Sequence, residues 1–139
     1  MPANRKRVIL DTNIWISFLL SDNLNHLEEL VFSGKIKLVF SQELIEEFVE
    51  VVRRPKFKDH ISKLDIEFIL LKIQDYADFI NVKSKVTLCR DKKDNFLLSL
   101  SIDGKADFLI TGDQDLLILG LIKETKIMTV KDFCQDILI

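Results

Sequence analysis

The sequence places acidic residues where an open α/β fold forms its ligand site. Asp11 directly follows one short apolar run, and Asp113 follows another after a Thr-Gly turn. Ligands of open parallel sheets bind outside the carboxyl ends of the strands, so both carboxylates are expected at one edge. They are neighbours there only if their strands are adjacent. Asp91 and Asp94 begin a helical segment, and a helix between parallel strands starts at that same edge. A group of acids at one sheet edge is therefore predicted.

A further acid is expected from the helical segment that follows Ser41. This segment holds glutamates at 43, 46, 47 and 50, and its apolar residues recur at helical spacing. At about 100° per residue, Glu47 borders the apolar stripe and the other three project away from it. Glu47 is therefore the expected acid facing the fold. A shift of the helix by one residue would replace it with Glu46, and the sequence leaves that alternative open.

Carboxylates gathered in this way repel one another. A pair at ~4 Å costs about 4 kcal/mol at an effective dielectric of ~20, so a cation is expected among them. With oxygen ligands and no Cys or His in the set, Mg²⁺ or Mn²⁺ fits best. Such an ion activates water and balances charge during attack on a phosphodiester. No glycine-rich phosphate loop or nucleophile elbow competes, so metal-assisted phosphodiester hydrolysis is predicted.

Composition limits the class of protein. The chain has 139 residues, 47% hydrophobic and 30% charged, which is enough for one core, and a single domain over 1–139 is predicted. Its net charge of -2 excludes a binder that depends on overall positive charge. Cys89 and Cys134 fit neither a disulfide framework nor a zinc spacing, which favours a cytoplasmic location. No apolar run reaches the roughly 20 residues of a membrane helix, so no membrane contact is expected.

The elements that must position the acids follow from the alternation of short apolar runs with longer segments of helical period. This alternation predicts a three-layer α/β/α fold with a central, mostly parallel sheet of four or five strands. The expected strands are 8–10, 37–40, 79–82, 108–110 and 127–128. The expected helices are 14–20, a segment capped by Ser21 or Asp22 and stopped by Gly34, 41–53, 62–77, a segment from Asp91 or Asp94 to Gly104, and a last one capped by Thr129.

Basic residues near the acids are candidate RNA contacts. They are Arg53, Arg54, Lys56, Lys92 and Lys93. A charged turn such as 53–58 is more often only solvated, but it can also track a nucleic-acid backbone with Phe57 available for stacking. Trp15, Phe96 and Phe108 are expected to be core residues and not base-stacking platforms.

Four stretches of the chain resemble the PIN-domain ribonucleases, in particular the VapC-like toxins of bacterial and archaeal toxin-antitoxin systems. The stretch Val-Ile-Leu-Asp-Thr-Asn at 8–13 resembles the opening motif of the family, and 41–55 resembles its acidic helix with the Arg-Pro segment. The stretch Asp-Lys-Lys-Asp-Asn at 91–95 resembles the acidic helix start. The most specific likeness is 106–117, which contains Thr-Gly-Asp-Gln-Asp. Together these stretches extend over nearly the whole chain.

The resemblance implies a set of site residues. Asp11, Glu47, Asp94 and Asp113 would be the catalytic and metal-binding acids, with Asp115 a lesser metal ligand and Thr12, Asn13 and Thr111 in support. It also implies Mg²⁺- or Mn²⁺-dependent endonucleolytic cleavage of single-stranded RNA by a homodimer that a cognate antitoxin restrains.

Three other functions are alternatives to this one. A phosphoryl-accepting receiver domain would need an acidic pair after the first strand, where Asp11 stands alone before Thr and Asn. A haloacid-dehalogenase-type phosphatase would need Asp-x-Asp, and Asn13 occupies the second position. The alternative that stays open is a catalytically degenerate PIN-like domain that binds RNA or a protein.

Overall fold

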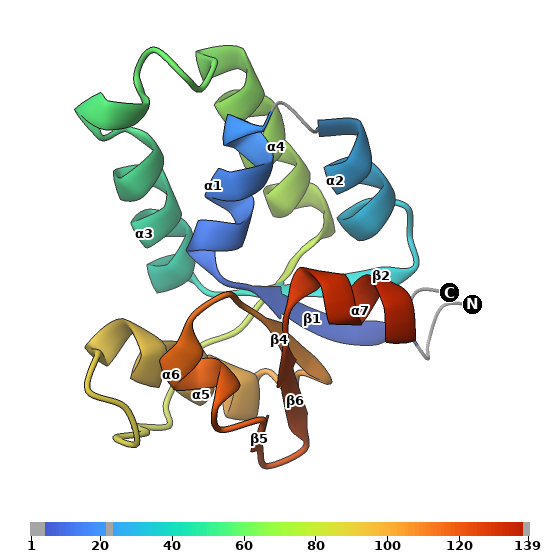
Figure 1. Ribbon diagram of the computed structural model, residues 1–139, viewed down its shortest axis with the longest axis vertical. Helices are drawn as coiled ribbons and strands as arrows, with labels where there is room; N and C mark the ends of the chain where they lie inside the picture. The colour runs from blue at the N-terminus through green and yellow to red at the C-terminus, as the bar shows by residue number, and fades with distance from the viewer. Residues whose placement is uncertain (1–4, 22–23, 138–139) are drawn as a thin grey trace.

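The computed structural model describes residues 5–21 and 24–137 (Figure 1). The described residues form a six-stranded sheet in the order β3-β2-β1-β4-β6-β5. The strands are β1 (Lys6–Leu10), β2 (Ile36–Phe40), β3 (Asp78–Phe79), β4 (Phe108–Ile110), β5 (Leu121–Ile122) and β6 (Thr125–Met128). The helices are α1 (Thr12–Leu20), α2 (Leu24–Val31), α3 (Gln42–Val52), α4 (Lys63–Tyr76), α5 (Lys92–Asp103), α6 (Gln114–Leu117) and α7 (Val130–Asp136), with a 3₁₀ turn η1 (Pro55–Phe57).

The sheet is parallel except for the pair β5 and β6. Helices α1 to α4 lie on one side of it, and α5 and α6 lie on the other (Figure 1). The predicted α/β/α fold with a mostly parallel sheet is thus confirmed. Helices cover both faces, so the central strands are apolar throughout: Val8, Ile9 and Leu109 are fully buried.

Helices begin directly at the strand ends because capping residues stand there. Ser41 follows β2 and accepts a hydrogen bond from the backbone N–H of Leu44 at 3.0 Å. Thr129 follows β6 and caps α7 in the same way, and Ser62 caps α4 in the segment after η1. These caps are the expected ones, whereas the proposed cap Asp22 lies outside the described residues.

The expected strand 79–82 is wrong in its bounds, because β3 has only the residues Asp78 and Phe79. After Ile80 the backbone leaves the sheet, and its N–H groups find side chains of α5 instead. Asp103 accepts from the N–H of Ser84 at 2.8 Å, and Ser99 accepts from the N–H of Val86 at 3.0 Å. The chain beyond the expected strand is thus held by side chains of α5 and not by a strand partner.

The expected count of four or five strands is too low, because the described sheet has six. β5 is a two-residue strand that pairs antiparallel with β6, and the turn between them places Lys123 at φ 52°. The four-residue helix α6 was not expected either. Both are shorter than the windows over which hydrophobic periodicity can be recognised.

The core lies around the central strands and the first helix. Trp15 and Phe108 are buried, as expected. The centroid of the Trp15 ring lies 5.9 Å from that of the Phe40 ring and 6.1 Å from that of the Phe48 ring. Phe96 was also expected in the core, but it is only partly buried at the margin of the core. No helix in the described part of the chain combines the length and apolar character needed to cross a membrane.

Gly104 at the end of α5 is expected to be sensitive to substitution. A Cβ there would lie 2.7 Å from Cγ1 of buried Val39 and 2.9 Å from the Leu100 carbonyl oxygen. Gly104→Ala should therefore lower the free energy of unfolding by about 1–3 kcal/mol in urea titrations, as overpacking does. Gly112→Ala is the matched control, since nothing lies within 4 Å of its Cβ position. Equal stability of the two variants would contradict this assignment of strain.

Candidate active site

The acids that follow β1 and β4 lie side by side because these strands are adjacent and parallel, with Leu10 in register with Ile110. The sequence had left that adjacency open. The hydroxyl of Thr111 donates to Oδ2 of Asp11 at 2.8 Å and accepts from the backbone N–H of Asp113 at 3.0 Å. One threonine thus fixes one acid and the backbone of the other.

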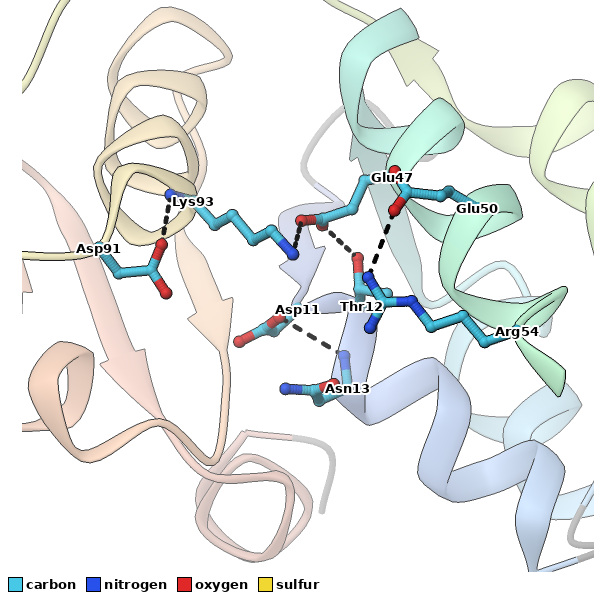
Figure 2. A network of polar contacts seen from close by, with 8 residues as sticks. All are labelled: Asp11, Thr12, Asn13, Glu47, Glu50, Arg54, Asp91 and Lys93. Atoms are coloured by element: carbon cyan, nitrogen blue, oxygen red, sulfur yellow. Dashed lines mark hydrogen bonds and ion pairs between the residues drawn. The ribbon is translucent and has the colours of Figure 1, made fainter. Parts of the chain in front are cut away.

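Glu47 reaches the same edge from α3, which follows β2 on the other side of β1. Its Oε1 accepts a hydrogen bond from the Thr12 hydroxyl at 2.7 Å (Figure 2). Glu46 is exposed and lines a different hollow together with Phe79. The helix therefore turns Glu47 and not Glu46 toward Asp11.

A cavity of about 220 Å³ lies between these elements. All four acids expected from the sequence, Asp11, Glu47, Asp94 and Asp113, line it. The other lining residues are Thr12, Asn13, Val51, Arg54, Asp91, Lys93 and Leu97. The carboxylates therefore come from four separate stretches of chain and face one cavity.

Asp115 lies at the exposed margin of this group. One carboxylate oxygen each of Asp94, Asp113 and Asp115 lie within 4.8 Å of one another, a spacing that could hold a metal ion. Asp115 also pairs with Arg90 at 3.4 Å, although the arginine side chain is 90% exposed and such a pair contributes little stability. Asp91 caps α5 by accepting from the N–H of Lys93 at 2.9 Å.

Asp94 is the most perturbed group of the cavity. Only 4% of the residue is exposed, and its Oδ2 has no hydrogen-bond partner among the described residues. Burial, followed by the charges of Asp113, Asp91 and Asp11, raises its pKa from 3.8 to about 7. Burial also raises the pKa of Asp11, although the hydrogen bond from Thr111 opposes the shift.

These observations fit a divalent cation among the carboxylates. A buried carboxylate oxygen without a donor is costly, and the neighbouring carboxylates raise that cost. A hard cation such as Mg²⁺ or Mn²⁺ would supply the missing partner to Asp94 and neutralise the group, and it prefers carboxylate oxygens. Asp11, Asp94 and Asp113 have the donor chemistry to hold it, with Asp115 at the margin.

The raised pKa of Asp94 predicts a pH-dependent stability of the metal-free protein. Below pH 3.8 the carboxyl is protonated in both states; from there to about 7 it ionises only in the unfolded chain. The unfolded state then binds fewer protons, so stability falls as the pH rises through this window. Urea unfolding should show wild type losing stability relative to Asp94→Asn over this window. A pH-independent difference would contradict the assignment.

The five basic candidates divide into two groups. Arg54 and Lys93 line the cavity: Lys93 Nζ lies 3.5 Å from Oε2 of Glu47, reaching across from α5 to α3, and Arg54 pairs with Glu50 at 3.3 Å (Figure 2). The other three lie outside it. Lys92 lines a neighbouring groove, Arg53 lines a hollow with Leu70, and the Lys56 ammonium stands 5.0 Å from the Phe57 ring centroid.

The sequence analysis did not identify two polar residues that lie near the site, Asn95 and Arg90. The side-chain amide of Asn95 accepts from the Cys89 N–H at 2.7 Å and donates to the Cys89 carbonyl at 2.9 Å, which fixes the chain entering α5. An Asn in a first helical turn often bonds local backbone, and that was the available signal. Arg90 has no comparable signal, because its partner Asp115 is distant in sequence.

The amino-acid sequence of the chain is similar to those of known proteins. A family model described as the PIN domain matches residues 7–115. The uncharacterized protein MJ1680 of Methanocaldococcus jannaschii is 30% identical over 122 residues, which cover 86% of this chain and 78% of that protein. No solved structure matches the chain at a significant level.

Proposed function

Because this chain belongs to the PIN domain family, a family of metal-dependent nucleases, we propose that it is an Mg²⁺- or Mn²⁺-dependent endoribonuclease that hydrolyses phosphodiester bonds of single-stranded RNA. The observation that carries the proposal is the buried Oδ2 of Asp94, which lacks a hydrogen-bond partner among the described residues and lies among other carboxylates. A hard cation binds carboxylate oxygens, so it would complete this unsatisfied oxygen.

In this proposal Asp11, Asp94 and Asp113 hold the cation, and Asp115 contributes from the exposed side. When bound, the ion would supply Lewis-acid chemistry, activating water for attack and offsetting negative charge on the phosphate. The Thr111 hydroxyl holds Asp11 in place, so the carboxylate needs no rearrangement during the reaction.

Glu47 has a different role from the three aspartates. The Thr12 hydroxyl holds one of its oxygens and the Lys93 ammonium lies 3.5 Å from the other, so the carboxylate is directed into the cavity. From there it can also contact the ion, or orient the attacking water and accept its proton. Arg54 and Lys93 are the cations of the cavity lining, and we assign them contacts to the RNA phosphates.

The proposal extends to the cellular role. The likeness of the motif stretches to VapC-like proteins supports a cytoplasmic toxin that acts as a homodimer and is restrained by a cognate antitoxin. A small open reading frame immediately upstream, whose product copurifies with this chain and blocks its cleavage of RNA, is the expected finding. An isolated gene with no such product would overturn this part of the proposal alone.

The direct test is cleavage of a synthetic single-stranded RNA by the purified full chain. Cleavage is expected with Mn²⁺ or Mg²⁺ and none with EDTA, and a double-stranded RNA of the same sequence should be cut more slowly. Equal cleavage with and without EDTA would overturn the metal-dependent mechanism. Binding of Mn²⁺ and RNA without any cleavage would favour the degenerate binding module instead.

A further inference from the structure

A second cavity of about 200 Å³ lies beside the proposed catalytic cavity, between α3 and α5. Three of its lining residues, Glu47, Lys93 and Leu97, also line the catalytic cavity, so the two hollows share a wall. The remaining lining residues are Glu43, Leu44, Lys92 and Phe96. Whatever occupies the second hollow therefore lies next to the group that occupies the first.

The second cavity combines an apolar interior with a charged rim of two lysines and two glutamates. Leu44 and Leu97 are buried, and Phe96 is only partly buried, unlike the core aromatics. Lys92 and Lys93 precede Phe96 by four and three residues on α5, a spacing that puts all three on one side of the helix. An aromatic side chain is thus placed directly beside two cations.

We propose that this cavity binds one nucleobase of the RNA, next to the phosphodiester that is cut, and that this base stacks on Phe96. The inference rests on the proposed function and names the part of the substrate that the second cavity recognises. Unpaired RNA bases stack on aromatic side chains while lysines hold the neighbouring phosphates. A base in a duplex is already stacked, so the cavity would favour single-stranded RNA.

The wall shared with the proposed catalytic cavity favours RNA over a protein as the occupant, because a base beside the cut phosphodiester would lie there. A strand of RNA alternates flat bases with anionic phosphates, and the cavity offers an apolar slot with Lys92 and Lys93 on the side of Phe96 and Glu43 and Glu47 on the side of α3. The pair of Lys93 with Glu47 spans 3.5 Å, and the lysine side chain is 59% exposed. Such a pair is weak, so Lys93 can turn to a phosphate at little cost.

The experiment is a scan with abasic RNA. A synthetic single-stranded RNA with one cleavage site is made in versions that each lack one base flanking the cut. Wild type should cut one of these versions about 5- to 100-fold more slowly than the intact RNA, which is the effect of losing one stacked base. Phe96→Leu, which keeps the apolar packing, should cut the intact RNA equally slowly and no longer distinguish the two RNAs. Phe96→Tyr should restore the difference.

Phe68→Ala, on an exposed aromatic of α4, is the matched control and should behave as wild type. If wild type cuts every abasic RNA as fast as the intact one, the inference is overturned although the chain is a nuclease. A change in sedimentation of Phe96→Leu with unchanged cleavage would assign the cavity to a protein contact and overturn it as well.

If no RNA is cut, the proposed function fails, and measurements of RNA binding then test the base site. Intact and abasic RNAs are then titrated against Asp94→Asn with and without Phe96→Leu, by fluorescence anisotropy. A 5- to 100-fold weaker Kd for one abasic RNA, seen only with Phe96 present, supports the base site. Equal Kd values for all RNAs overturn it.

Discussion

Replacing Asp94 with asparagine is expected to lower kcat/KM for RNA cleavage by at least about 100-fold, more than the loss of a residue that only supports a metal ligand. The amide puts an uncharged nitrogen or oxygen where the unpaired Oδ2 stands and removes one negative charge from the group. Initial rates on a synthetic single-stranded RNA, at saturating Mn²⁺, measure the effect.

The loss should occur without unfolding. Asp94→Asn relieves a buried charge, so the metal-free variant should be more stable than wild type by about 1 kcal/mol at pH 8. Asp132→Asn, an exposed acid in the first turn of α7, is the matched control and should cut RNA at the wild-type rate. If Asp94→Asn cut RNA as fast as wild type, Asp94 would not be a residue of the active site.

The second large effect is the stabilisation of the chain by a divalent ion. At 100 times Kd, Mn²⁺ should raise the free energy of unfolding by about 2.7 kcal/mol, which raises Tm by several degrees. EDTA should reverse the shift. Because the pKa of Asp94 is about 7, ion binding near neutral pH should also release protons. Calorimetric titrations in two buffers with different ionisation enthalpies measure that release.

Asp94→Asn should lose most of this shift, and KCl at the same ionic strength should not reproduce it, since monovalent salt only screens the acids. A shift of equal size in wild type and Asp94→Asn would place the ion elsewhere. If KCl at the same ionic strength raised Tm as much as Mn²⁺ does, the stabilisation would be general charge screening and not binding of an ion at this site.

The alternation of apolar runs and helical segments was sufficient to predict the α/β/α fold. Strands such as β1 and β4 are buried on both faces and read as unbroken apolar runs, and their neighbouring helices carry side-chain caps. The elements at the edges were not predictable. Strands β3 and β5 have two residues each, and pairing with a neighbour, not their own composition, makes them strands.

The same division applies to the candidate site. The position of Asp11 and Asp113 after strands followed from local pattern, and so did the orientation of Glu47, because a helix repeats its faces at a fixed angle. The approach of Lys93 to Glu47 did not follow, since the two residues belong to helices whose distance depends on how α3 and α5 pack against the sheet. The exposure of Phe96 was missed for the same reason.

The sequence by itself determined the kinds of element and the acids at their ends, because capping, helical period and strand burial are short-range properties of the chain. Only the tertiary structure decided that β1 lies between β2 and β4. That order brings distant carboxylates together, buries Asp94 without a donor among the described residues and opens a slot beside Phe96. Strand order depends on the packing of the whole core, and no short stretch of residues encodes it.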